Sequence, residues 1–409
     1  MRLLIVTQYF WPENFRINDL VSELIIRGHD VTILTGKPNY PDGKIFSDFI
    51  DRPGDFDCYK GAKIIRVPML PRKVGNFSLI LNYISFALSA STIGCWRLRN
   101  YKVDAIFAYE PSPITVGIPA VLLRSIKKAP LLFWVLDLWP ETLEAIGVLR
   151  AKWGLNLIGK LVSCIYKHCD LILAQSKSFI PKITNYAGID IPVVYFPGWA
   201  EAVFEIKKPM PAPEVLLDSK SFNIVFTGNI GEAQDFPSIL SAAELLKNHK
   251  NIRWLIIGDG RQAAWLKNQI QVRGLQRSVL MLGLYPIDRM PSFFAHADAL
   301  LVTLKDEPIF SMTIPGKLQT YLSAGIPILG MLNGEGADVI SSGNAGLCCS
   351  AGDYKALADS ILRLSSLLPE ERLRIGLNAS VVSEKQFSRK NLIDQLELWF
   401  DDVCSKVSR

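Results

Sequence analysis

Short apolar runs alternate with longer runs of helical spacing along the first half of the chain. Runs rich in β-branched and aromatic residues predict buried strands. The predicted strands are Arg2–Thr7, Val31–Thr35, Lys63–Val67, Asp104–Tyr109, Leu131–Leu136, Leu171–Ala174 and Val193–Phe196. Between them, Ile17–Arg27 and Leu155–Lys167 repeat apolar residues every three or four positions, which predicts helices. Such strand–helix–strand units build a parallel sheet.

A Pro-rich segment, Pro197–Pro213, has the composition of a linker, and the same alternation resumes after it. The second set of predicted strands is Phe222–Thr227, Arg253–Gly258, Val279–Leu282, Ala299–Val302 and Pro327–Leu329. The second set of predicted helices is Pro237–Lys247, Ala263–Gln271, Ile287–His296, Gly316–Ala324 and Tyr354–Leu367.

We therefore expect an α/β fold with two doubly wound, Rossmann-like domains, residues 1–198 and 199–387. Ligands of such sheets bind beyond the carboxyl ends of the strands, so the expected site is a cleft that both domains face. The last helix, Ser388–Val407, is amphipathic. We expect residues 388–409 to cross back and pack on the N-terminal domain.

Charge is distributed unequally between the two halves. Residues 1–195 hold 23 Lys and Arg against 16 Asp and Glu, whereas the rest of the chain has a net charge of −1. A one-sided positive field suits an anionic partner such as a phospholipid headgroup or a phosphorylated acceptor, although ordinary surface solvation gives the same count. With 49% hydrophobic residues, some apolar surface is expected to face lipid or a partner.

The seven cysteines are odd in number and irregularly spaced, which predicts no disulfide framework and favours a reducing compartment. No export signal is visible before the first predicted strand. These features predict a cytoplasmic protein.

The first predicted strand does not open into a G-x-G-x-x-G turn, which disfavours a nicotinamide or flavin enzyme. In the second domain, Gly228-Asn229-Ile230-Gly231 follows one strand, and Gly258-Asp259-Gly260-Arg261 follows the next. Backbone amides at such a turn and at the start of the following helix can hold a diphosphate.

The most specific stretch runs from Leu304 to Ile328 and holds Pro315-Gly316-Lys317 at a helix start, then Ala324-Gly325-Ile326-Pro327 before a strand. It resembles the nucleotide-binding region of family 4 retaining glycosyltransferases of the GT-B fold. Further resemblance lies in Gln8–Glu13, Arg27–Val31, Asp137–Glu141 and Gly228–Gly231. The chain looks most like O-antigen and surface-polysaccharide transferases of the fucosamine-transferase type.

This resemblance implies that the nucleotide sugar binds mainly to the C-terminal domain and the acceptor to the N-terminal domain. The expected donor-binding residues are Gly228, Asn229, Gly231, Gly258, Arg261, Tyr285, Ile314, Pro315, Gly316, Lys317 and Thr320. The expected catalytic residues are Asp137, Glu307 and Lys317.

Two departures from the family pattern affect the donor site. Relatives usually carry a Glu-x7-Glu pair, but Met312 and Thr320 stand at those positions, and the Gly228 loop lacks the usual cations. Lys317 and Arg261 are then the expected partners of the diphosphate, and Glu307 is a candidate for binding a sugar hydroxyl. An exposed lysine at a helix start is the alternative for Lys317.

The expected acceptor-binding residues, Arg16, Glu110, Asp137 and Glu141, all follow predicted strands of the first domain. Their carboxylates could bind acceptor hydroxyls, or Asp137 and Glu141 could merely cap a helix and pair with its dipole. Many relatives have His where Leu136 stands.

No metal site is expected: Asp55-Phe56-Asp57 is interpreted as a loop, and the four histidines lack ligand spacing.

From Val74 to Trp96 the chain has no charged residue, between Arg72-Lys73 and Arg97 with Arg99. Ser78, Asn82, Ser85, Ser89 and Thr92 form one polar stripe along this predicted helix, and bulky apolar residues cover the rest. An interfacial membrane helix, a buried helix and a transmembrane span are all compatible with the pattern, and the stripe favours the first.

The sequence as a whole predicts a metal-independent, cofactor-free, retaining transferase at the cytoplasmic face of the inner membrane. Its expected partners are a UDP-sugar donor, such as a UDP-N-acetylaminosugar, and a lipid-diphosphate-linked saccharide acceptor; no nucleic acid is expected. Two alternatives stay open: a nucleotide-sugar epimerase or hydrolase of the same fold, and a catalytically degenerate partner of a transferase.

Overall fold

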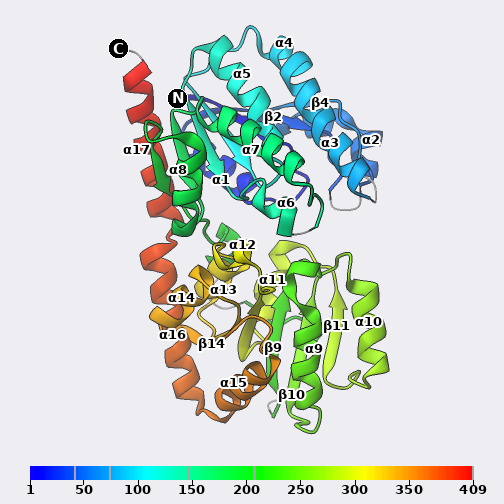
Figure 1. Ribbon diagram of the computed structural model, residues 1–409. Helices are drawn as coiled ribbons and strands as arrows, with labels where there is room; N and C mark the ends of the chain where they lie inside the picture. The colour runs from blue at the N-terminus through cyan, green and yellow to red at the C-terminus, as the bar shows by residue number, and fades with distance from the viewer. Residues whose placement is uncertain are drawn as a thin grey trace. The chain divides into compact units, whose positions relative to one another are not determined.

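The computed structural model describes the 409-residue chain except residues 41, 42, 73, 74, 146, 206–208, 217, 219, 408 and 409 (Figure 1). Lys73 and Val74 of the uncharged segment, and Lys207 and Lys208 of the linker, thus lie outside the described residues. The chain divides into two compact units. Met1–Pro197 and Lys390–Arg409 form the first, and Gly198–Arg389 forms the second.

The first unit contains an eight-stranded sheet with the strand order β3-β4-β2-β1-β5-β6-β7-β8. Only β3 runs antiparallel to its neighbour. The strands are β1 Arg2–Val6, β2 Asp30–Gly36, β3 Cys58–Tyr59, β4 Ala62–Val67, β5 Ala105–Glu110, β6 Leu131–Val135, β7 Leu171–Ala174 and β8 Val193–Tyr195. The helices are α1 Arg16–Ile26, α2 Ser47–Asp51, α3 Asn76–Ser89, α4 Cys95–Leu98, α5 Gly117–Lys127, α6 Glu141–Ala145, α7 Lys152–Tyr166, α8 Ile180–Ala187 and α17 Arg389–Val407.

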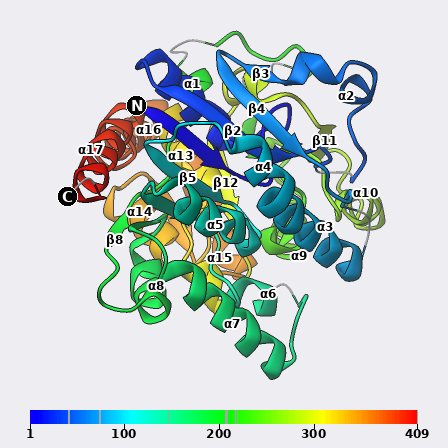
Figure 2. The same cartoon turned by 90° about the horizontal axis from the view of Figure 1, so that it is seen from above.

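Every residue of β5, β6 and β7 is buried, which explains their unbroken apolar sequences. Helices α4, α5 and α7 lie on one face of this sheet, and α1 and α17 on the other (Figure 2). Because both faces are covered, alternating polar positions would be buried without partners.

Helix α17 packs on the first unit through aromatic and charged contacts. The Phe400 ring lies 6.0 Å from the Phe107 ring on β5. Arg27 at the end of α1 pairs with Asp394 at 2.6 Å and with Glu397 at 2.5 Å. His29 Nε2 lies 2.8 Å from the Glu397 carboxylate. The last helix therefore belongs to the N-terminal domain.

The second unit contains a six-stranded, all-parallel sheet with the order β11-β10-β9-β12-β13-β14. Its strands are β9 Phe222–Thr227, β10 Ile252–Ile257, β11 Val279–Gly283, β12 Ala299–Thr303, β13 Ile328–Met331 and β14 Gly346–Cys349. Its helices are α9 Phe236–Leu245, α10 Ala263–Val272, α11 Met290–Phe294, α12 Pro308–Ser311, α13 Gly316–Ala324, α14 Glu335–Ser342, α15 Tyr354–Ser366 and α16 Pro369–Gln386.

The prediction of two parallel-sheet, Rossmann-like domains is confirmed. The edge strands β3 and β14 were missed, because Cys58-Tyr59 is only two residues long and Gly346-Leu347-Cys348-Cys349 is half-buried and lacks a β-branched residue. Helix α16 was also missed. Leu373, Leu377 and Val381 are exposed on it, so its apolar positions do not mark a core-facing stripe.

The uncharged segment is not one regular helix. Helix α3 continues through a π-helical turn, Ala90–Gly94, into α4. By length and composition alone, Ser78–Leu98 could cross a membrane: its most apolar stretch has a mean hydropathy of 1.4. In the structure, 39% of that stretch is buried. Buried core helices meet the same criteria.

Candidate active site

Two glycine turns of the second unit meet beyond β9 and β10. Ile230 N donates to Asp259 O at 2.8 Å, and Gln262 N donates to Ile230 O at 3.0 Å. A Cβ on Gly258, whose φ is +146°, would lie 1.9 Å from Gly228 O. Only glycine allows this backbone approach.

Lys317 in the first turn of α13 extends toward the Gly228 turn. Its Nζ donates to Gln234 Oε1 at 2.8 Å and lies 3.7 Å from the centre of the Phe226 ring. A Cβ on Gly228 would lie 3.6 Å from the same Nζ. Across the described ranges, no carboxylate forms an ion pair with this ammonium group, whose pKa burial lowers to about 7.

The loop after β12 lies beside the same turn. Lys305 N donates to Ala233 O at 2.9 Å, and the Thr303 hydroxyl donates to Gln234 O. Glu307 follows in this loop, is partly exposed and precedes the first residue of α12. The loop that carries Glu307 thus contacts Ala233 and Gln234, and Lys317 bonds to the Gln234 side chain.

The remaining predicted donor residues vary in exposure. Ile314, Pro315 and Thr320 are buried, and Gly316 is exposed at the start of α13. Arg261 is exposed in the turn before α10. Tyr285 follows β11, and its ring lies 4.7 Å from the Phe293 ring. Asn229 lies within the Gly228 turn, where a Cβ on Gly231 would approach its Nδ2 to 2.6 Å.

The predicted acceptor carboxylates meet at the carboxyl edge of the first sheet. Glu110 ends β5, Asp137 follows the neighbouring β6, and Asp137 N donates to Glu110 Oε2 at 3.4 Å. Glu110 is fully buried and Asp137 is partly exposed. Glu110 therefore holds the backbone N–H of Asp137, and its carboxyl group is buried at the edge where the sequence predicts both acceptor residues.

Burial controls the protonation of this pair. It raises the pKa of Asp137 to about 7. It also raises the pKa of Glu110 well above its usual value, and the nearby Asp137 charge raises it further. Burial thus favours the protonated form of both carboxyl groups.

The other two acceptor candidates lie on helix starts. Arg16 is the first residue of α1, which follows β1, and is partly buried. Glu141 is the first residue of α6, and the Tyr186 hydroxyl donates to its Oε1 at 3.4 Å. Strands β1, β5 and β6 are neighbours in the sheet; Arg16 and Asp137 follow the outer two, and Glu110 ends β5 between them.

Sequence reasoning missed the role of Glu13. It is 3% exposed and accepts backbone N–H groups of Asn39 at 2.8 Å, Tyr40 at 2.7 Å and Phe10 at 3.2 Å. Burial raises its pKa to about 7. Glu13 thereby joins the loop after β1 to the loop after β2. A lone carboxylate in an aromatic segment was the available signal.

The Asp55-Phe56-Asp57 segment lies at an exposed 3-10 turn, Pro53–Phe56, where Asp55 pairs with Arg52 at 3.6 Å. Within the described part of the chain, no group of three or more His, Cys, Asp or Glu side chains is arranged to hold a metal ion.

Most of the second unit matches a known protein family. Residues 221–366, which include both glycine turns and Lys317, match the family model described as glycosyl transferases group 1. The chain contains a group 1 glycosyltransferase domain.

Sequence relatives extend this similarity beyond the glycosyltransferase domain. The Escherichia coli protein WcaI, whose name assigns it to colanic acid biosynthesis as a glycosyl transferase, is 24% identical over 80% of this chain and 82% of its own. WbjE of Pseudomonas aeruginosa, named as a glycosyltransferase, is 30% identical over 62% of this chain and 66% of its own.

Solved structures share the fold over the whole chain. Anabaena Alr3699/HepE, in complex with UDP and glucose, has a TM-score of 0.70 at 14% identity and covers 98% of this chain and 99% of its own. WaaG, a glycosyltransferase involved in lipopolysaccharide biosynthesis, has a TM-score of 0.67 at 12% identity over 97% and 98%. At these identities the likeness establishes only the fold: the N-terminal domain and the glycosyltransferase domain together have the GT-B fold.

Proposed function

We propose that this chain is a retaining glycosyltransferase that moves a sugar from a UDP-sugar to a lipid-diphosphate-linked saccharide during surface-polysaccharide assembly. The observation that carries the proposal is the desolvated Lys317 ammonium beside the Gly228 turn, inside a group 1 glycosyltransferase domain. The UDP complex of Alr3699/HepE supports the nucleotide. WcaI and WaaG support the polysaccharide context.

In the proposed reaction the acceptor hydroxyl attacks the anomeric carbon while the bond to the diphosphate oxygen breaks. The departing phosphate oxygen takes the proton of that hydroxyl, which retains the anomeric configuration without a protein nucleophile. Lys317, Arg261 and the amides of the Gly228 turn stabilise charge on the diphosphate. The resemblance to family 4 enzymes of the fucosamine type favours an N-acetylaminosugar donor.

Asp137 and Glu307 complete the proposed catalytic set. The partly exposed Asp137 orients the acceptor hydroxyl, and Glu110, which accepts from its backbone N–H, is a positioning residue. Arg16 and Glu141 are the further proposed acceptor-binding residues. Glu307 binds a donor-sugar hydroxyl in place of the missing glutamates.

Thermal-shift measurements test the proposal. We expect UDP and its sugars to raise the melting temperature more than GDP, ADP and their sugars, because a ligand bound only by the folded state stabilises that state. Transfer of label from a UDP-sugar to a native lipid extract then tests catalysis. UDP binding without transfer to any extract would instead favour a degenerate partner protein.

A second candidate function rests on the Glu110–Asp137 pair. Two carboxyl groups with raised pKa values could act as acid and base in a nucleotide-sugar epimerase or hydrolase. Incubation with a UDP-sugar and no acceptor separates the two: epimerised sugar or free UDP formed at the full catalytic rate would establish the second function.

We predict that activity survives exhaustive EDTA treatment, because Lys317 and backbone amides carry the diphosphate charge that a metal would otherwise neutralise. The measurement is the initial rate of sugar transfer before and after chelation. Loss of activity that Mn²⁺ or Mg²⁺ restores would contradict metal independence.

The N-terminal domain is the proposed membrane-binding part, at the cytoplasmic face of the inner membrane. Along α3, Ile80 is 44% exposed, Ile84 45% and Leu88 63%, whereas Leu79, Tyr83 and Phe86 are buried. Asn82 of the polar stripe is fully buried and bonds with Gln8 and the Leu70 carbonyl. The helix therefore has one core face and one outward apolar face, as an interfacial helix requires.

We predict that Ile80→Ser/Ile84→Ser/Leu88→Ser lowers co-sedimentation with anionic liposomes and activity on lipid-linked acceptor, while activity on a short soluble acceptor persists. Each apolar side chain buried in lipid contributes about 1.5–3 kcal/mol. The matched control is Leu373→Ser/Leu377→Ser/Val381→Ser, which removes three exposed apolar side chains from α16 of the other domain. A triple α3 variant that folds and sediments like wild type would place membrane binding elsewhere.

A further inference from the structure

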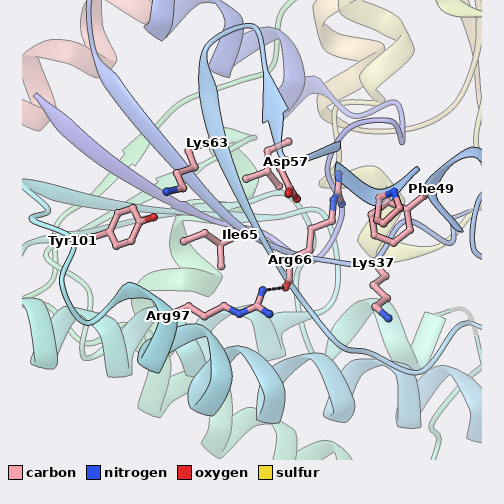
Figure 3. A pocket seen from close by; sticks show the side chains of 10 residues that line it. Lys37, Phe49, Asp57, Lys63, Ile65, Arg66, Arg97 and Tyr101 are labelled. Carbon is pink, nitrogen blue, oxygen red and sulfur yellow. Dashed lines mark hydrogen bonds between the residues drawn. The ribbon is translucent and has the colours of Figure 1, made fainter. Parts of the chain in front are cut away.

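A cavity of about 470 Å³ lies along the outer edge of β4 in the N-terminal domain (Figure 3). The short β3 pairs with Ala62 and Lys63, and Ile64 N donates to Asp57 O at 2.9 Å, so among the described residues no strand pairs with this edge of β4 beyond Ile64. Ten residues line the cavity: Lys37, Phe49, Pro53, Asp57, Lys63, Ile64, Ile65, Arg66, Arg97 and Tyr101. Four of them are cationic and Asp57 is the only acidic one.

The four cations come from three separate elements. Lys37 follows β2, Lys63 and Arg66 belong to β4, and Arg97 belongs to α4. Arg97 Nη1 donates to Arg66 O at 3.0 Å, which holds α4 against the strand (Figure 3). Lys63 Nζ lies 4.9 Å from the centre of the Tyr101 ring. The fold therefore lines one cavity with four positive charges from three elements.

Arg66 is the buried member of this group. It is 8% exposed, and its Nη1 donates to Gly36 O at 2.9 Å. Its Nε is buried and has no hydrogen-bond partner among the described residues. A buried donor without a partner costs about 1–3 kcal/mol, which an anionic acceptor in the cavity would recover.

The cavity is separate from the acceptor carboxylates. Strands β2 and β1 lie between β4 and β5, so three strand spacings of about 4.8 Å separate the outer edge of β4 from Glu110, roughly 14 Å. A ligand here would not occupy the position of the reacting hydroxyl.

The neighbouring surface indicates what the ligand is. On α4, Trp96 next to Arg97 is 63% exposed, and the Arg99 guanidinium lies 4.3 Å from the Trp96 ring centre. Tryptophan and arginine exposed together suit the headgroup region of a bilayer. The same segment carries the outward apolar residues of α3.

We propose that this cavity binds the phosphate group of an anionic phospholipid and so holds the N-terminal domain in a defined orientation on the membrane. The inference rests on the proposed membrane function of that domain. Lysine and arginine on an edge strand can also serve to prevent pairing with another chain. That role needs charges only on β4, whereas Lys37 and Arg97 come from other elements.

Binding of dihexanoyl phosphatidylglycerol below its micelle concentration tests the site without vesicle docking. We expect calorimetry to give a dissociation constant about 10-fold or more higher for Lys37→Gln/Lys63→Gln, because the cavity loses two of the four cations that line it. The control Lys102→Gln/Lys128→Gln removes the same charge from exposed positions outside the cavity and should bind as wild type does. Stabilisation by UDP, measured in parallel, reports whether each variant is folded.

Four outcomes would overturn the inference. Unchanged lipid binding in the cavity variant would exclude the cavity, and equal loss in the control would show that only net charge matters. Inorganic phosphate that binds as tightly, with the same sensitivity to Lys37 and Lys63, would assign the cavity to free phosphate. If lipid binding fails while UDP binding and liposome binding through α3 persist, this inference fails and the proposed function stands.

Discussion

Lys317→Ala is expected to weaken UDP binding about 10- to 150-fold, equivalent to about 1.5–3 kcal/mol for one charge-assisted contact. The Nζ lies beside the Gly228 turn and has only the neutral Gln234 oxygen and the Phe226 ring as partners given by the structure. A diphosphate would supply the missing negative charge. Isothermal calorimetry with UDP measures the effect directly.

Two further variants separate charge from packing. Lys317→Met keeps the apolar stem over Phe226 and should lose as much affinity as Lys317→Ala. Lys267→Ala removes an exposed charge from α10 and should change nothing. Wild-type affinity in Lys317→Met would show that the ammonium group does not bind the diphosphate.

The pH dependence of UDP binding follows from the same group. Since burial lowers the pKa of Lys317 to about 7, the free protein loses this proton as the pH rises through 7. Only the protonated form attracts the diphosphate, so wild-type affinity should fall from pH 7 to pH 9. The same titration of Lys317→Met should be flat over that range, and a parallel decline would assign the effect to another group.

Gly258→Ala is expected to lower the free energy of unfolding by about 2–5 kcal/mol and to abolish stabilisation by UDP. Its Cβ would lie 1.9 Å from Gly228 O at a φ of +146°, so the two glycine turns must separate. The diphosphate amides would move with them. Chemical denaturation and UDP thermal shifts measure the two effects.

Gly352→Ala is the matched control in the same domain. Gly352 also has a positive φ, +78°, but a Cβ there meets no atom within 4 Å. It should cost only the conformational strain, about 1–2 kcal/mol, and keep UDP binding. Equal effects of the two substitutions would mean that the close approach of the turns is not needed.

Periodicity along the chain determined the architecture of both domains. Strands such as β5 and β9 are buried at every position, so their apolar runs are continuous and easily recognised. Every residue of the edge strand β14 is only partly buried, so its sequence lacks the continuous apolar run that marks a central strand. The order of the strands within each sheet depends on long-range packing, which no local pattern encodes.

For the candidate site, too, the sequence indicated part of the arrangement and only the structure showed the rest. Sequence placed Lys317 at a helix start and Glu110 and Asp137 at strand ends, because loops after parallel strands share one edge of the sheet. Burial was not visible there: Glu110 is buried, and Glu13 joins two loops through backbone N–H groups.

The tertiary structure alone decided where charges converge and what surrounds them. Lys37, Arg66 and Arg97 are far apart in the sequence, and only Arg97 was singled out there, as a basic residue bordering the uncharged segment; β2, β4 and α4 bring all three to one cavity. Likewise, burial lowers the pKa of Lys317, and its neighbours Phe226 and Gln234 come from other elements. Local patterns specify which elements form, whereas the free energy of a charge depends on neighbours that only the folded chain assembles.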